Sequence, residues 1–123
     1  MTVIPYLLLA ADRHEHLRPA ASDALAQIGG DDVSKRLRER TVWYLQPTPR
    51  GKVRHSDFTV EVERWAIHTT GKLDPKRLSD QERLNVRESL LELKQKDPDE
   101  PCRREAETAL SRLTAAGLLS PAK

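Results

Sequence analysis

The chain has 123 residues, of which 37% are hydrophobic and 33% are charged, a balance that suits one domain with a thin two-layer core. Only five residues are aromatic, and an apolar supply made mostly of leucine and alanine favours helix over strand. The single cysteine excludes an internal disulfide, and no apolar run has the length of a membrane span or the pattern of a signal peptide, so we expect a reducing, cytoplasmic setting.

The first third of the chain predicts two helices. Residues 3–11 are apolar, with Pro5 in the first turn, where a missing N–H costs nothing, and this first helix is expected to end near Asp12. A polar turn over 12–16 separates them from a second helix over 17–28. Gly29 and Gly30 are expected to end that second helix. Its buried side chains should be those at helical spacing: Leu17, Ala21, Ala24, Leu25 and Ile28.

A third helix is expected over 33–45, with Asp31 or Asp32 as its N-cap. Its buried stripe should consist of Val33, Leu37, Thr41, Tyr44 and Leu45. The opposite, outward face should carry Lys35, Arg36, Arg38 and Arg40. Two prolines then break regular structure, and a long basic loop over 46–55 follows.

A fourth helix is predicted to follow Ser56 or Asp57. One face of it would carry Phe58, Val62, Trp65 and Ala66. Alternation of apolar residues from 58 to 62 also fits a strand, so a hairpin within residues 41–62 remains an alternative.

The last third again predicts two helices. Ser79, followed three residues later by Glu82, forms a capping-box pattern for a fifth helix that ends near residue 96. The side chains expected to be buried in it are Leu84, Leu90, Leu91 and Leu93. A turn over 97–101 precedes a sixth helix over 102–115, which ends at Gly117.

An internal repeat links the two ends of the chain. With an offset of 85 residues, 12–28 aligns with 97–113, and six of the seventeen positions are identical. Half of that offset is about 42 residues, within the period of helical-pair solenoids. Residues 33–74 have the length of a middle unit, but their sequence matches the first and last units poorly. An ordinary helical bundle is therefore the alternative.

The repeated pattern runs from an apolar helix through an Asp-containing turn to Leu-Arg-x-x-Ala-x-x-Ala-Leu-x-x-Ile-Gly, as at residues 17–29. It resembles a HEAT repeat, especially the short bacterial type also found in phycobilin lyase subunits. The resemblance implies an all-α fold, a short right-handed α-solenoid of about three helix pairs, in a single domain spanning 1–123. The repeats would cover about 3–30, 33–74 and 79–117, the middle one irregular with a basic loop. It also implies a protein-binding scaffold.

No motif predicts catalysis, so we expect no enzyme activity. His14, Glu15 and His16 are the clustered potential metal ligands, but their spacing favours a solvated turn, and we expect neither metal nor cofactor. Cys102 could have a lowered pKa at a helix N-terminus, yet it occupies an apolar repeat position and is expected in the core.

The middle of the chain is basic: residues 35–77 carry eleven basic and five acidic side chains, net +6, between flanking segments of net −3. These charges could form a solvated face, attract an acidic protein or bind nucleic acid. We expect a non-catalytic protein-binding module, its partner held on a concave face of the second helices; nucleic-acid binding is the alternative, and a small lyase or chaperone subunit a third. The candidate binding residues are Lys35, Arg36, Arg38, Arg40, Arg50, Lys52 and Arg54.

Overall fold

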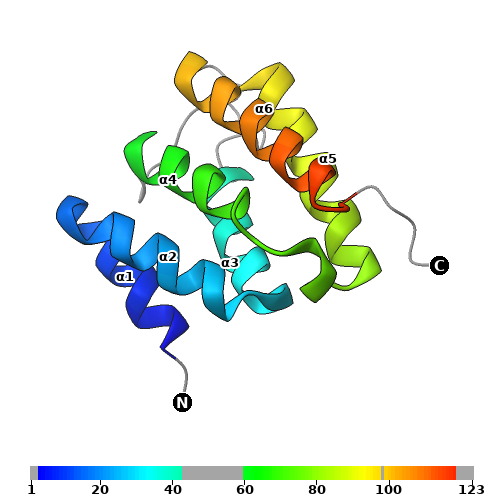
Figure 1. Ribbon diagram of the computed structural model, residues 1–123. Helices are drawn as coiled ribbons and strands as arrows, with labels where there is room; N and C mark the ends of the chain where they lie inside the picture. The colour runs from blue at the N-terminus through cyan, green and yellow to red at the C-terminus, as the bar shows by residue number, and fades with distance from the viewer. Residues whose placement is uncertain (1–2, 43–59, 98, 119–123) are drawn as a thin grey trace, which may run out of the picture.

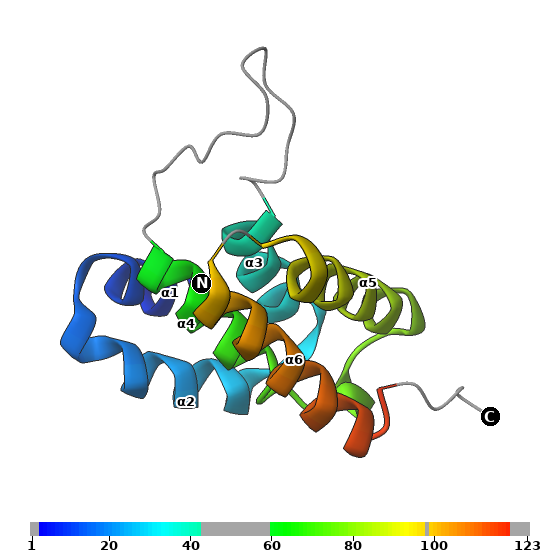
Figure 2. The same ribbon diagram turned by 90° about the horizontal axis from the view of Figure 1, so that it is seen from above.

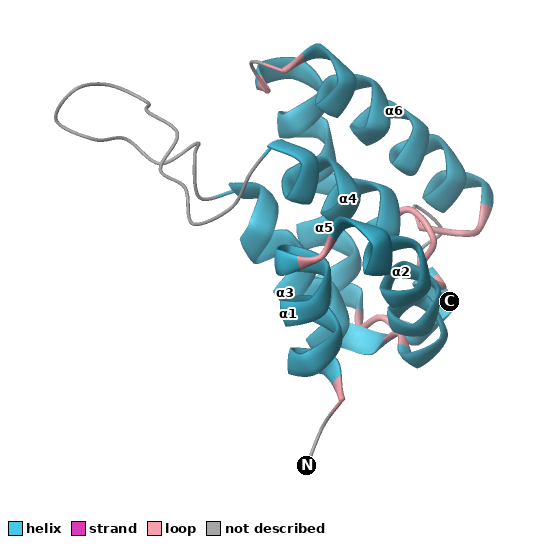
Figure 3. Ribbon diagram, turned by 90° about the vertical axis from the view of Figure 1, so that its left-hand side faces the viewer, coloured by secondary structure: helices cyan, strands magenta, loops and turns pink. Residues whose placement is uncertain are grey.

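The structure, a computed structural model, describes residues 3–42, 60–97 and 99–118, and the secondary structure in these ranges consists of helices joined by short turns (Figures 1 and 3). No strand occurs in these ranges, so the expected all-α class is confirmed for them. In chain order the elements are α1 (Ile4–Arg13), the 3-10 helix η1 (Glu15–Leu17), α2 (Arg18–Ile28), α3 (Gly30–Val42), α4 (Val60–Thr70), the 3-10 helix η3 (Pro75–Arg77), α5 (Asp80–Lys96) and α6 (Glu100–Ala115).

The helices pack in consecutive pairs, α1 with α2, α3 with α4 and α5 with α6. The pairs are joined to one another mainly through α4, which also contacts α2 and α6, while α3 contacts α5. Seen from above, α1, α3 and α5 lie along one side of the molecule and α2 and α6 along the other (Figure 2). The central helix α4 therefore contacts a helix of each pair.

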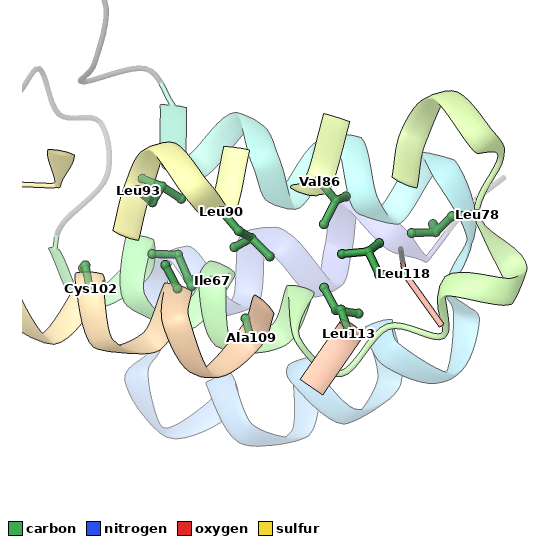
Figure 4. Close-up of a cluster of buried hydrophobic side chains, with 10 residues drawn as sticks. Ile67, Leu78, Val86, Leu90, Leu93, Cys102, Ala109, Leu113 and Leu118 are labelled. Atoms are coloured by element: carbon green, nitrogen blue, oxygen red, sulfur yellow. The ribbon is translucent and has the colours of Figure 1, made fainter. Parts of the chain in front are cut away.

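Two apolar clusters meet at α4. Trp65 and Ala66 belong to the cluster with α1, α2 and α3, whereas Ile67 belongs to the cluster with α5 and α6 (Figure 4). The indole Nε1 of Trp65 donates a hydrogen bond to the carbonyl of Arg18 at 2.8 Å, which satisfies the polar atom of a side chain only 8% exposed. Neighbouring residues of α4 therefore pack into both apolar clusters, Trp65 and Ala66 into one and Ile67 into the other.

The C-terminal end of α4 approaches the middle of α6 closely at Gly71, the residue that follows α4. A Cβ placed there would lie 2.9 Å from both the Cα and the Cβ of Ala109, well inside normal contact. Gly71 and the small Ala109 therefore let the two helices pack at this distance.

Several expectations about the caps hold in part. Gly29 ends α2 with a φ of 60°, as predicted, but Gly30 already belongs to α3, so Asp31 and Asp32 lie in its first turn. Ser79 caps α5, its Oγ accepting from the amide of Glu82 at 3.1 Å. The reciprocal half of the capping box does not form, because the Ser79 amide donates to Asp31 Oδ1 at 2.8 Å.

The predicted buried faces of the second and fifth helices need correction. Leu84 is 51% exposed and Leu17 is 38% exposed, whereas Val86, not expected in the core, is 2% exposed. Ala24 and Leu91 are partly buried rather than fully buried. The buried stripe of α5 runs through Glu82, Val86, Leu90 and Leu93, and a glutamate among its members explains why the apolar pattern alone pointed to Leu84.

The hairpin alternative does not apply to the described residues, because Thr41 lies in α3 and Val62 in α4. The predicted core residues Tyr44, Leu45 and Phe58 lie outside the described residues.

Candidate functional site

The basic residues of α3 are largely committed to contacts within the fold. Arg38 was expected to face outward, but its Nη2 lies 2.9 Å from each carboxylate oxygen of Glu82 on α5. Glu82 is 1% exposed and also accepts a 2.7 Å hydrogen bond from the hydroxyl of Ser34. This pair links α3 to α5 and satisfies a buried charge.

Arg40 also points into the fold. Its Nε and Nη2 donate to the two carboxylate oxygens of Asp12 at 2.9 and 2.6 Å, a bidentate pair that joins α3 to the end of α1. The two side chains are only 12% and 14% exposed. Because the carboxylate of Asp12 engages the donors and balances the charge of this guanidinium, Arg40 is a weak binding group for an external anion.

The other candidate cations are either on the surface of α3 or outside the described residues. Arg36 pairs with Asp32 one turn before it at 3.0 Å on the surface, and Lys35 is exposed. Arg50, Lys52 and Arg54 lie outside the described residues. Within the described residues, the structure therefore does not bring the four cations of α3 together as one free surface.

An exposed apolar face lies on α1 instead. Val3, Tyr6 and Leu9 are 52%, 67% and 46% exposed, and their spacing of three places them on one side of the helix. The opposite side of α1 packs Ile4, Leu8 and Ala11 into the core. We call Val3, Tyr6 and Leu9 the α1 strip; it lies on a helix at one edge of the molecule (Figure 1).

The second helices carry a polar surface. A shallow hollow of about 310 Å³ between α4 and α6 is lined by Arg64, Pro101, Arg104, Glu105 and Thr108. Within it the carboxylate of Glu105 lies 3.3 Å from His68 Nδ1 and 4.0 Å from Arg64 Nε. The charges of this face therefore neutralise one another in part.

A third group of functional side chains is buried where α4, the α5–α6 turn and the start of α6 meet. Glu63 and Cys102 are fully buried and Asp97 is 1% exposed. Each residue offers one potential ligand atom: a carboxylate oxygen from Glu63, one from Asp97 and the Sγ of Cys102. These three atoms lie within 4.8 Å of one another. We call these three residues the Glu63–Asp97–Cys102 cluster.

Cys102 is a buried core residue, as expected. Burial raises the pKa of its thiol far above the usual value, and the nearby charge of Glu63 and a hydrogen bond with Asp99 act in the same direction. The expected lowering of this pKa by the helix N-terminus is thus outweighed by burial and by negative neighbours.

The histidines around residues 14–16 form an exposed turn, as expected. The rings of His14 and His16 are edge to face with centroids 5.8 Å apart, and both residues and Glu15 are exposed. His68, on α4, contacts Glu105 and is not near that turn in sequence.

Sequence reasoning missed the buried carboxylates. Glu63 is separated from Asp97 by 34 positions and belongs to another helix pair, and only the packing of α4 against α6 brings them together. Asp97 was assigned to a polar turn, where an acidic residue is ordinarily exposed. No local spacing signals such a group.

Comparisons with known proteins identify no relative: no family model, no curated protein and no solved structure matches the chain. Among the described residues, none of the helices combines the length and the apolar character needed to cross a membrane.

Proposed function

We propose that this chain is a non-catalytic protein-binding module, built as a short α-solenoid of the HEAT-like kind. The pairing of α1 with α2, α3 with α4 and α5 with α6 supports the solenoid, as do the contacts that α4 makes with α2 and α6. Each pair leaves an apolar stripe that only a neighbouring pair can cover, which is the physical basis of such arrays.

The observation that carries the proposal is the α1 strip. Of the five large apolar side chains that are exposed among the described residues, four lie in the first 17 positions, at the α1 end of the array. The opposite end, formed by α5 and α6, exposes one, Leu84. The water-exposed faces of stacked helices are ordinarily polar, so an apolar outer face on α1 favours a covering protein with an apolar surface of its own.

The position of the strip also bears on the alternative. Nucleic acid is bound mainly through free cations that neutralise phosphates, whereas Arg38 and Arg40 are engaged by Glu82 and Asp12. A tyrosine flanked by aliphatic side chains is instead typical of the centre of a protein interface. These facts favour a protein partner over nucleic acid, and α1 over the second helices as the face that meets it.

The test compares a double variant, Tyr6→Ser with Leu9→Ser, with the wild type and with Leu84→Ser. All three altered side chains are more than 45% exposed, so the variants should fold with wild-type melting temperatures. Proteins captured from the native host in the presence of nuclease are identified, and the affinity of the purified partner is then measured at two salt concentrations.

We expect the double variant to lose at least tenfold in affinity, Leu84→Ser to bind as the wild type does, and salt to have little effect. Unchanged binding by the double variant would remove the α1 strip from the proposal. Capture that disappears with nuclease and weakens steeply with salt would support the nucleic-acid alternative.

A further inference from the structure

The Glu63–Asp97–Cys102 cluster places two carboxylates and a thiol together in the interior. Their ligand atoms lie within 4.8 Å of one another, and all three residues are at most 1% exposed. Buried carboxylates ordinarily occur with a cation, a full set of hydrogen bonds or a bound metal, because the charged form is costly to remove from water.

The polar contacts of Asp97 leave one oxygen unused. Its Oδ1 accepts from the amide of Asp99 at 2.9 Å, whereas its Oδ2 is buried with no hydrogen-bond partner among the described residues. Arg103, in α6, donates from Nη1 to the main-chain carbonyl of Asp97 at 2.6 Å. The oxygen of a side chain 1% exposed is thus free for a ligand that lies in the interior.

The donor set indicates which ligand would fit. Mg²⁺ and Ca²⁺ take six or more oxygen ligands, and a thiolate is a poor donor for them. One sulfur with two carboxylate oxygens suits a borderline divalent ion such as Zn²⁺ or Co²⁺, which binds four ligands, the fourth supplied by water or by a second carboxylate oxygen.

We propose that Glu63, Asp97 and Cys102 form a structural binding site for one divalent transition-metal ion of the zinc class. Glu63 comes from the first turns of α4, Asp97 follows α5, and Cys102 lies in the first turn of α6. The ion would therefore cross-link three elements at one end of the second apolar cluster, where Cys102 lies on the same side as Leu93 (Figure 4). Its role is to hold the α5–α6 turn against α4, and the site is independent of the α1 strip.

Binding replaces the thiol proton with the metal: the S–H bond breaks, an S–metal bond forms, and one proton leaves to solvent without any change of oxidation state. The carboxylates of Glu63 and Asp97, which lie beside the sulfur, are groups that attract a cation.

The experiment uses the full chain refolded with Co²⁺ in a buffer with a non-thiol reductant, then desalted. Bound metal is counted by elemental analysis, and thiolate coordination is read from the sulfur-to-cobalt charge-transfer absorption. Because the sequence has one cysteine, this absorption can arise only from Cys102. Cys102→Ala and Asp97→Asn remove a ligand each, and His14→Ala, in the exposed histidine turn, is the matched control.

The wild type and His14→Ala should hold about one ion per chain with the charge-transfer band, and Zn²⁺ should raise their melting temperatures. Cys102→Ala should lose the band and the thermal shift, and Asp97→Asn should weaken binding at least tenfold. Folding of each variant is checked without metal by circular dichroism. A wild type that retains no stoichiometric ion, or binds one without the band, overturns the proposal, as does metal that is kept by Cys102→Ala and lost in His14→Ala.

Discussion

Arg38 and Glu82, 44 residues apart in sequence, form an ion pair between α3 and α5 in which one guanidinium nitrogen lies 2.9 Å from both carboxylate oxygens. The pair is asymmetric, since the Arg38 side chain is 25% exposed and that of Glu82 is 1% exposed. Loss of the arginine therefore leaves a charge that cannot reach water, whereas loss of the carboxylate leaves one that can.

This asymmetry predicts the order of two mutations. Arg38→Ala should lower the free energy of unfolding by about 3–5 kcal/mol, and Glu82→Gln by clearly less, because glutamine can still bond to Ser34. Arg36→Ala, which breaks an exposed pair on the same helix, should cost about 0.3–0.5 kcal/mol. Urea denaturation measures all three, and equal losses for Arg38→Ala and Arg36→Ala would show that the Glu82 carboxylate is not held as described.

The approach of α4 to α6 predicts a steric effect. Gly71→Ala places a methyl group 2.9 Å from Ala109 and should destabilise the fold by about 1–3 kcal/mol. Ala109→Gly removes one of the two clashing atoms, so the double variant should be more stable than the sum of the single changes by about 0.5 kcal/mol or more. Strict additivity in this double-mutant cycle would mean that the two positions do not touch.

The core positions predict a graded series on α5 and α6. Leu113→Ala, at 1% exposure, should cost about 2–5 kcal/mol, and Leu110→Ala less, because Leu110 is only partly buried against the same cluster. Leu84→Ala, at 51% exposure, should leave the melting temperature nearly unchanged. A large loss with Leu84→Ala would mean that α5 is rotated from its described orientation.

Asp31 predicts a contribution to acid sensitivity. Its hydrogen bonds with the side chain and amide of Ser79 lower the pKa of the carboxyl below its ordinary 3.8, and the charges of Lys35 and Arg83 act in the same direction. A lowered folded pKa stabilises the native state above pH 3.8, and this stabilisation is lost as the pH falls through the folded value. Asp31→Asn should therefore flatten the acid limb of the stability profile, measured by urea unfolding at several pH values; an unchanged slope would contradict it.

Features that depend on contacts within one helical turn were predictable from the sequence, whereas features that depend on contacts between helices were not. The serine cap of α5 and the glycine ends of α2 and α6 were predictable, because each depends on contacts within one turn. Which side of α5 is buried depends on α3 and α6, and the buried Glu82 interrupts its apolar stripe, so Leu84 was a reasonable but wrong core residue.

The candidate sites also depend on contacts between residues far apart in sequence. Arg38 and Arg40 look like surface cations in a basic helix, and only the positions of Glu82 and Asp12 on other helices reveal them as internal partners. Tyr6 and Leu9 lie in an apolar segment whose sequence does not show which side is exposed, and among the described residues only the opposite side of α1 is buried. Glu63, Asp97 and Cys102 come from three elements and share no motif.

Hydrogen exchange with and without the purified partner tests the central claim, that α1 is the face that binds another protein. We expect slowed exchange of the amides of Ile4–Arg13 when the partner is present, with little change in α4 and α6. Protection confined to residues 35–54, or to α4 and α6 with α1 unaffected, would contradict it.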